Sequence, residues 1–204
     1  SAPPARPRPA VVIDPGHGGD DRGALLSPSL PEKQVTLAWA RRLRSALQQK
    51  GITAILLRDS DISLTLDERA ALANAARPQV FITLHAGSVG TGVRIYTAHM
   101  GESAPRAGSF LPWNSAQAAF LDGSRAVAGS IAAEMRKREI PSGTAPVFLR
   151  PLTNIAGPGV AIEVMPVTAD VGTLMSAGYQ YSVCAAIADG IAASGKLSAR
   201  KAVP

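Results

Sequence analysis

The sequence of 204 residues has one cysteine, few aromatic residues and no long apolar run. The lone Cys184 cannot form an internal disulfide, and its alanine-rich apolar surroundings are typical of a small buried hydrophobic side chain. No stretch reaches the roughly 18 to 20 apolar residues that a membrane-spanning helix needs. The start of the sequence also lacks the basic and then apolar pattern of a secretory signal. We therefore expect no transmembrane segment.

Net positive charge is scarce in the middle of the sequence, although the formal net charge of the whole is +6. Cations without acidic neighbours lie in the two tails, namely Arg6, Arg8, Lys196, Arg200 and Lys201. The stretch between the tails is therefore nearly neutral, and only 4% of all residues are aromatic. Because nucleic-acid surfaces combine basic stripes with aromatic side chains, we expect no nucleic-acid partner. The tail charges would weakly favour an anionic wall or membrane surface.

The length and a hydrophobic content of 46% allow one substantial core and leave too few residues for a second. Residues 1–9 are rich in proline and arginine, and they predict an extended linker with further sequence upstream. Residues 196–204 are small, polar and basic, which predicts a frayed tail. We therefore assign a single domain to residues 10–195.

Strand and helix patterns alternate between the two tails. The predicted strands are residues 10–13, 52–57, 80–84, 92–96, 146–149 and 160–162. The predicted helices are residues 32–50, 64–76, 115–138 and 171–193, the last interrupted near Gly178. This order predicts an α/β fold, a three-layer sandwich with helices on both faces of one mixed, partly parallel, twisted sheet of about six strands.

Three polar residues stand at or just beyond the ends of predicted strands. His17 follows the first strand by a tight Pro-Gly turn, His85 ends strand 80–84, and Glu163 ends strand 160–162. Because the carboxyl ends of strands in an open α/β sheet share one edge, we expect these side chains to lie close together. Glu163 interrupts an apolar run, where a nearby cation would stabilise its charge. The alternative is an edge strand whose Glu163 faces water.

Each of these residues alone has an ordinary structural explanation. A lone histidine at a strand end is more often structural than functional, and Glu32 in the first turn of a helix is explained by the helix dipole. The third histidine, His99, is expected to be a loop residue. Together, however, His17, Glu32 and His85 form a donor set that is common in catalytic zinc sites, with a fourth position left for water. Glu163 would then move a proton from zinc-bound water to the leaving amine.

The motifs around these residues resemble the zinc-dependent N-acetylmuramoyl-L-alanine amidases of bacterial cell separation and sporulation, with a type 3 catalytic domain. The resemblance is carried by Val11 to Gly19, Glu32-Lys33, Leu66 to Ala70, Ala73-Asn74, Phe81 to Ala86, and Gly159 to Glu163. It implies that His17, Glu32 and His85 bind one Zn²⁺ ion and that Glu163 is the catalytic residue. The implied substrate is peptidoglycan, cut at the amide between the lactyl group of N-acetylmuramic acid and L-alanine. A periplasmic or extracellular location, a monomer, and an activator or upstream wall-targeting region are also expected.

The sequence departs from that family at positions beside the predicted site. Gly87 stands where the family commonly has asparagine, and Val164 to Val167 replaces a usual Gly-Phe-Leu-Ser-Asn continuation. The segment from Met100 to Gly123 is longer than the family minimum, and we expect it either to border the glycan groove or to cover part of the site. Asp14 is expected to order the first loop, and Arg69 to form a pair or a cap within the fold.

Two other functions stay open at this point. A protein could keep this fold and bind peptidoglycan without cutting it, because the departures flank His85 and Glu163. A zinc peptidase acting on the stem peptide would apply the same metal chemistry to a different amide. A serine hydrolase is not expected, since the sequence has no Gly-x-Ser-x-Gly motif.

Overall fold

The computed structural model describes residues 10–100 and 113–195. The linker predicted for residues 1–9, the tail predicted for residues 196–204 and positions 101–112 of the long predicted segment lie outside the described residues. Among the described residues, six strands form one sheet and two short strands form a hairpin.

The sheet is mixed. Its strands are β1 (Val11–Pro15), β4 (Ala54–Leu56), β5 (Val80–Ala86), β6 (Gly92–Ala98), β7 (Ser142–Val147) and β8 (Gly159–Met165). Their order across the sheet is β4-β1-β5-β8-β6-β7. Strand β6 runs antiparallel to β8, and every other neighbouring pair is parallel. The carboxyl ends of β1, β5 and β8 therefore lie at the same edge.

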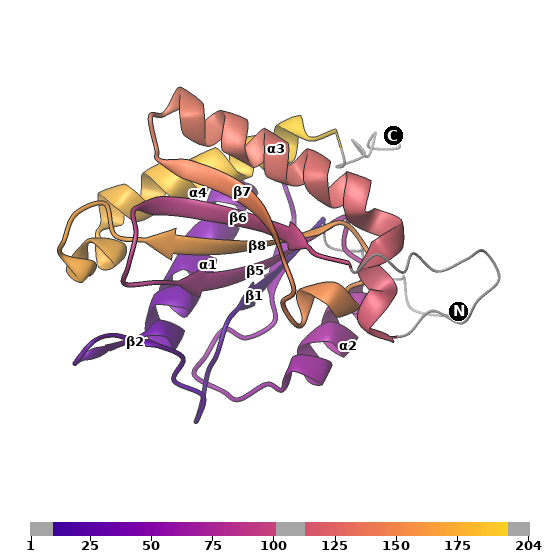
Figure 1. Ribbon diagram of the computed structural model, residues 1–204, viewed down its shortest axis with the longest axis horizontal. Helices are drawn as coiled ribbons and strands as arrows, with labels where there is room; N and C mark the ends of the chain where they lie inside the picture. The colour runs from indigo at the N-terminus through magenta and orange to yellow at the C-terminus, as the bar shows by residue number, and fades with distance from the viewer. Residues whose placement is uncertain (1–9, 101–112, 196–204) are drawn as a thin grey trace.

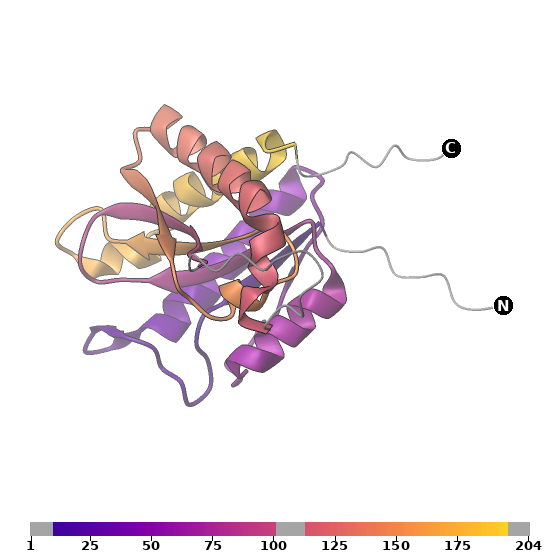
Figure 2. The same cartoon turned by 45° about the vertical axis from the view of Figure 1, so that its right-hand side comes forward.

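Helices cover both faces of this sheet. They are α1 (Glu32–Gln49), α2 (Leu66–Ala76), α3 (Leu121–Lys137) and α4 (Ala177–Ala193), with 3-10 segments η1 (Trp113–Phe120), η2 (Leu152–Asn154) and η3 (Val171–Met175). Helices α1, α3 and α4 contribute to the larger hydrophobic cluster, and α2 and η2 contribute to the smaller one. Figures 1 and 2 show α3 and α4 lying side by side. Helices on both faces of one mixed sheet confirm the predicted three-layer α/β fold.

Strand β1 shows how the sheet separates the two hydrophobic clusters. Val11 and Ile13 belong to the cluster with α1, α3 and α4, whereas Val12 between them belongs to the cluster with α2. Because both faces are buried, the strand is a continuous apolar run rather than an alternating one. Runs of this kind are why the sequence predicts the central strands within a few residues of their observed bounds.

The prediction is less accurate at the edge of the sheet and before α1. Strand β7 covers residues 142–147 instead of the predicted 146–149, because Ser142 to Ala145 is exposed at the sheet edge and has no apolar pattern. A hairpin of β2 (Leu25–Ser27) and β3 (Leu30–Pro31) leads into α1 and was not predicted. Strands of two or three residues are too short to produce a periodic signal.

Two of the predicted helices begin with 3-10 segments. The predicted helix 115–138 is η1 followed by α3, and the predicted helix 171–193 is η3 followed by α4. The boundary between η3 and α4 lies at Ser176, close to the interruption expected near Gly178. Trp39 of α1 donates a hydrogen bond from Nε1 to the carbonyl oxygen of Leu174 at 2.8 Å, which ties η3 to α1.

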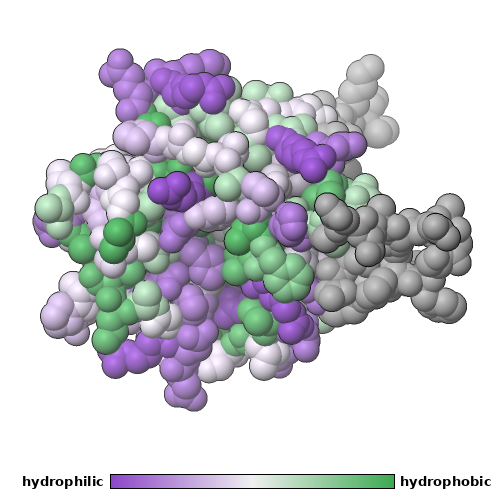
Figure 3. All heavy atoms as spheres, in the orientation of Figure 1, coloured by the Kyte–Doolittle hydropathy of each residue, from purple (hydrophilic) through white to green (hydrophobic). Residues whose placement is uncertain are grey.

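None of the described helices is both long and apolar enough to cross a bilayer. In Figure 3, strongly hydrophilic residues gather along the top of the molecule over α3, and apolar residues form separate small groups on the visible face. Small separate groups are ordinary for a protein surface.

The contact between α3 and α4 depends on a glycine, which allows a test of the fold. A Cβ atom at Gly190 would lie 2.5 Å from the Cα of Ile131. We expect Gly190→Ala to push the helices apart and to lower the free energy of unfolding by about 1–3 kcal/mol, measured by denaturant unfolding. Gly129→Ala on α3 is the matched control, because an added Cβ there has no neighbour within 4 Å. The control should stabilise the protein by up to about 1 kcal/mol, and equal effects would contradict this packing.

Candidate metal centre

The carboxyl edge of the central strands brings together side chains that are far apart in the sequence. His17 lies two residues beyond the end of β1, His85 lies near the end of β5, and Glu163 lies near the end of β8. The register of the parallel strands pairs His85 directly with Glu163. The amide of Gly16 also donates to the carbonyl oxygen of Leu84 at 2.9 Å, so the first loop is fastened to β5.

Glu32 reaches the same edge from the first turn of α1. The β2–β3 hairpin returns the chain so that the amide of Glu32 donates to the carbonyl oxygen of Ala24 at 2.8 Å. In the reverse direction, the amide of Ala24 donates to Oε2 of Glu32 at 3.0 Å. The amide of Ala86 donates to Oε1 at 3.1 Å, and the Glu32 residue is only 5% exposed. The carboxylate is therefore held by two backbone amides from separate elements.

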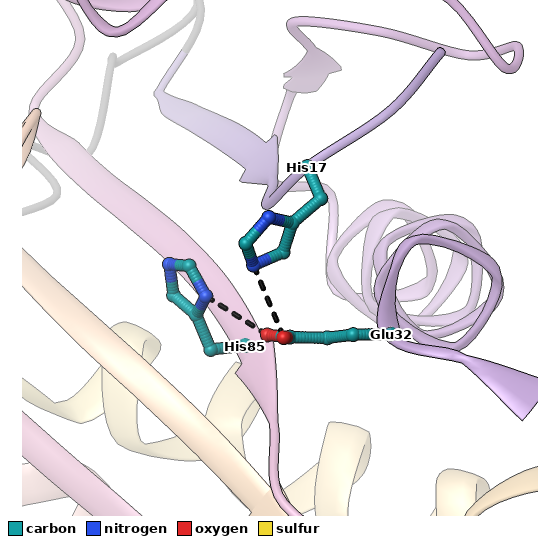
Figure 4. A group of neighbouring side chains, drawn as sticks. All are labelled: His17, Glu32 and His85. Atoms are coloured by element: carbon teal, nitrogen blue, oxygen red, sulfur yellow. Dashed lines mark hydrogen bonds and ion pairs between the residues drawn. The ribbon is translucent and has the colours of Figure 1, made fainter. Parts of the chain in front are cut away.

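Both histidines contact this carboxylate. Nε2 of His17 lies 3.1 Å from Oε2 of Glu32, and Nδ1 of His85 lies 3.0 Å from Oε1 (Figure 4). The imidazole rings meet edge to face, with their centroids 5.3 Å apart. One donor atom from each of the three residues can be chosen so that all lie within 4.8 Å of one another. Two imidazole nitrogens and one carboxylate that converge in this way match the donor set of an open zinc site.

The contacts shift the pKa values of the group in opposite directions. Burial alone would raise the pKa of Glu32, but hydrogen bonds from His17, His85 and the Ala24 amide lower it below its usual range. The pKa of His17 is raised, chiefly by its hydrogen bond with Glu32, and burial opposes this change. Glu32 is therefore ionised at neutral pH, which is the state that a cation needs in a ligand.

Asp21 fixes the orientation of His17. Its Oδ2 lies 2.8 Å from Nδ1 of His17, and its Oδ1 accepts a hydrogen bond from the amide of Gly23 at 3.0 Å. Histidines that bind metals usually donate their second ring N–H to a carboxylate or carbonyl, which sets the tautomer and the ring plane. With Nδ1 occupied in this way, Nε2 of His17 faces Glu32 and is the nitrogen that can bind a metal ion.

The loop that carries His17 is held by Arg69 of α2. The backbone of His17 has φ of 62°, a conformation that is unfavourable for residues other than glycine. Arg69 donates from Nη2 to the carbonyl oxygen of His17 at 2.7 Å and from Nη1 to that of Pro15 at 2.8 Å. It also pairs with Asp14. The Thr65–Glu68 capping box starts α2, so that Arg69 falls in the first turn of the helix.

Arg58 also holds this loop by donating hydrogen bonds to its carbonyl oxygens. Its Nε donates to the carbonyl oxygen of Pro15 at 3.0 Å, and its Nη2 donates to that of Gly16 at 2.9 Å. Nη2 also lies 3.1 Å from the hydroxyl of Thr36 on α1. Arg58 is 2% exposed, and burial followed by the charge of Arg69 lowers its pKa. The first loop is thus bound on its inner side by two buried guanidinium groups.

Glu163 stands beside the three donors without bonding to them. It lines a hollow of about 460 Å³ together with Glu32 and His85. The hydroxyl of Tyr96 donates to Oε2 of Glu163 at 2.8 Å. His99 lies beyond the end of β6, which runs antiparallel to β8, so it is at the opposite edge of the sheet. Glu163 therefore shares a hollow with two of the three predicted metal ligands, Glu32 and His85, and His99 is not among them.

Several supporting residues were not predicted from the sequence. Asp21 follows His17 by four positions, but an acidic residue in a glycine-rich loop is common and carries no specific signal. Arg58 looks like any surface arginine. Tyr96 acts across a strand pairing whose register no local pattern reveals. Asp14 and Arg69 do pair and order the first loop, as the sequence predicts.

Sequence comparison finds related proteins along nearly the whole described chain. The model of the N-acetylmuramoyl-L-alanine amidase family matches residues 11–193. The amidase AmiC of Neisseria meningitidis serogroup B is 38% identical over 92 residues, which are 42% of this chain and 22% of AmiC. The amidase AmiA of Escherichia coli K12 is 42% identical over 76 residues, which are 37% of this chain and 26% of AmiA. The matches thus span only about a fifth to a quarter of the length of these curated relatives.

Solved structures with the same fold include two amidases. The N-acetylmuramoyl-L-alanine amidase AmiC2 of Nostoc punctiforme is 27% identical with a TM-score of 0.68, covering 91% of this chain and 96% of that chain. The catalytic domain of CwlV, an amidase from Bacillus (Paenibacillus) polymyxa var. colistinus, is 27% identical with a TM-score of 0.70, covering 90% of this chain and 96% of that chain. The likeness therefore extends over almost all of both solved chains.

The contact between Asp21 and His17 leads to a prediction about zinc binding. We expect Asp21→Asn to lower the zinc affinity about 10- to 100-fold. The oxygen of the new side chain can still accept the hydrogen bond from the Gly23 amide, but its NH₂ group would then face the N–H of His17, and two donors cannot form a hydrogen bond. Competition with a chromophoric chelator measures this change. Asp20→Asn is the matched control, since it removes a carboxylate charge at the adjacent position and Asp20 forms no hydrogen bond with His17 in the described structure. Unchanged affinity in Asp21→Asn would show that the carboxylate does not orient a ligand.

Proposed function

Because the chain belongs to the type 3 N-acetylmuramoyl-L-alanine amidase family, we propose that it hydrolyses the amide between the lactyl group of N-acetylmuramic acid and L-alanine in peptidoglycan. The observation that supports this most directly is the contact of one buried carboxylate, Glu32, with both His17 and His85. Glu163 lines the same hollow as Glu32 and His85, which gives a candidate proton carrier next to a candidate metal site.

We propose that His17, Glu32 and His85 bind one zinc ion. Their donor atoms fit zinc in kind, because catalytic sites commonly use histidine nitrogens with one glutamate oxygen. They fit in position too, since the three donor atoms lie within 4.8 Å of one another. The hydrogen bond from His17 to Asp21 provides the outer support that such a site needs. Three protein ligands leave room for the substrate and for water.

The proposed roles follow from the chemistry of amide hydrolysis. When bound, zinc supplies a Lewis acid that lowers the pKa of water toward about 7 and polarises the substrate carbonyl. Glu163 accepts a proton from the attacking water as the new C–O bond forms. It then delivers that proton to the nitrogen of L-alanine as the C–N bond breaks, so the stem peptide leaves with a neutral amine. Glu163 ends the cycle as the carboxylate with which it began.

The setting of this reaction is also a proposal. Peptidoglycan places the enzyme in the periplasm or outside the cell, and the basic tails predicted from the sequence suit an anionic wall surface. We propose that the domain acts as a monomer on peptidoglycan, with an upstream wall-targeting region or a separate activator.

The proposal is tested by peptide release from purified peptidoglycan. We expect zinc-loaded protein to release stem peptides, a chelator to abolish release, and Glu163→Ala to reduce the rate at least about 100-fold, because a general acid–base group contributes 10²–10⁴. Glu163→Ala should keep the increase in melting temperature that zinc gives the unmodified protein, whereas His85→Ala should lose it.

Equal release in all of these samples would refute zinc amidase catalysis. Binding to peptidoglycan without release would instead identify a non-catalytic wall-binding protein. Mass spectrometry of the products separates the remaining alternative, a zinc peptidase. Free lactyl ends on the glycan, paired with peptides that begin with L-alanine, are expected for the amidase, whereas cuts inside the stem peptide would identify the peptidase.

A further inference from the structure

Tyr96 contacts the carboxylate of Glu163 across the antiparallel pair of β6 and β8. Its hydroxyl donates to Oε2 at 2.8 Å, and no other hydrogen bond to Glu163 is found within the described residues. Tyr96 stands opposite Ala161, two residues before Glu163 on the same face of β8. The small side chain of Ala161 lets the phenol ring reach its diagonal neighbour, a distance that aromatic side chains can span.

The ring of Tyr96 is itself well anchored. It is half-buried and packs against the smaller hydrophobic cluster, which includes Val12, Leu152 and Ala161. Burial, followed by the hydrogen bond with Glu163, raises the pKa of the Tyr96 phenol. The phenol therefore keeps its proton at neutral pH and acts as the hydrogen-bond donor. A fixed ring with a protonated hydroxyl can restrain a carboxylate that has only this one partner among residues 10–100 and 113–195.

Gly87 lies against the other oxygen of the same carboxylate. A Cβ atom at Gly87 would stand 2.9 Å from Oε1 of Glu163 and 3.6 Å from Cγ of Met165. Any side chain at this position would therefore displace Oε1. The family that the sequence resembles commonly has asparagine there, so this chain combines an open position at Gly87 with a tyrosine on the neighbouring strand.

We propose that Tyr96 is a positioning residue for Glu163 and that the missing side chain of Gly87 leaves its other oxygen, Oε1, free to exchange the proton. This inference rests on the proposed amidase function. Tyr96 occupies Oε2, so Oε1 can take the proton from the attacking water and then give it to the nitrogen of the leaving amine. Without the phenol hydroxyl, the Glu163 side chain would rotate among several orientations and fewer of them would be productive.

The first test replaces only the hydroxyl. In zinc-loaded protein acting on a soluble muropeptide, we expect Tyr96→Phe to lower kcat about tenfold while KM stays within about twofold. Zinc content and melting temperature should stay at the values of the unmodified protein. Tyr181→Phe is the matched control, because Tyr181 is 61% exposed on α4 and contacts no site residue in the described structure. An unchanged kcat in Tyr96→Phe would overturn the proposal.

A double-mutant cycle distinguishes positioning from a separate effect of Tyr96. In a Glu163→Ala background, Tyr96→Phe should cause no further loss of kcat, because the group that it positions is gone. An equal loss in both backgrounds would show that Tyr96 acts independently of Glu163. A crystal structure of zinc-loaded Tyr96→Phe gives a second readout, in which several orientations of the Glu163 carboxylate are expected and one unchanged orientation would overturn the proposal.

Gly87 is tested in the same assay. Gly87→Ala should lower kcat several-fold with little change in melting temperature, because the atom that it displaces is the free end of a side chain rather than backbone. Gly143→Ala on β7 is the control, since an added Cβ there has no neighbour within 4 Å. An unaffected kcat in Gly87→Ala would remove Gly87 from the proposal.

The outcomes for the inference and for the proposed function are distinct. Unmodified protein that releases no peptide would refute the amidase function. Unmodified protein that is active, with an equally active Tyr96→Phe, would refute only the role of Tyr96.

Discussion

Two buried guanidinium groups pull the carbonyl oxygens of the first loop inward, and the geometry of the site follows from this. The carboxylate of Asp14 and the loop carbonyls accept hydrogen bonds from Arg58 and Arg69, and these bonds offset the desolvation free energy of the two buried charges. With its carbonyl turned toward Arg69, the backbone of His17 adopts a left-handed conformation. The imidazole then faces Glu32. The loop thus depends on α2 and on the strand-to-helix connection that carries Arg58, neither of which contributes a metal donor.

The side chains that form the candidate centre could be found from the sequence, whereas most of those that support them could not. His85 and Glu163 each lie near the end of an apolar run, and such runs mark buried parallel strands with a common edge. Glu32 can be identified only through the family motif, since a glutamate in the first turn of a helix is ordinary. The contacts of Arg58 and Tyr96 depend on strand register and side-chain direction, which no short pattern encodes. The exposed strand β7 is mispredicted for a similar reason, because it has no buried face to leave a pattern.

Support for the candidate centre comes from different sources on its two sides. Asp21 orients His17, and the Ala24 amide holds one oxygen of Glu32, so the donor side is fixed by the loop and the hairpin. Glu163 takes its restraint from Tyr96 on a neighbouring strand. A rigid strand is a more exact support than a loop for a group that must meet a reacting atom. Sequence changes in the loops can therefore alter metal affinity separately from the orientation of the carboxylate.

The spread of the site along the chain has a consequence for biogenesis. Its four side chains come from positions between 17 and 163 and meet only when β1, β5 and β8 have paired in register. Parallel pairings are non-local contacts, whose loop-closure entropy must be overcome before they contribute stability. An incompletely folded chain therefore has no assembled donor set, so the proposed binding of a metal ion would require completion of the central sheet. A newly made copy would stay inert toward its surroundings until that point.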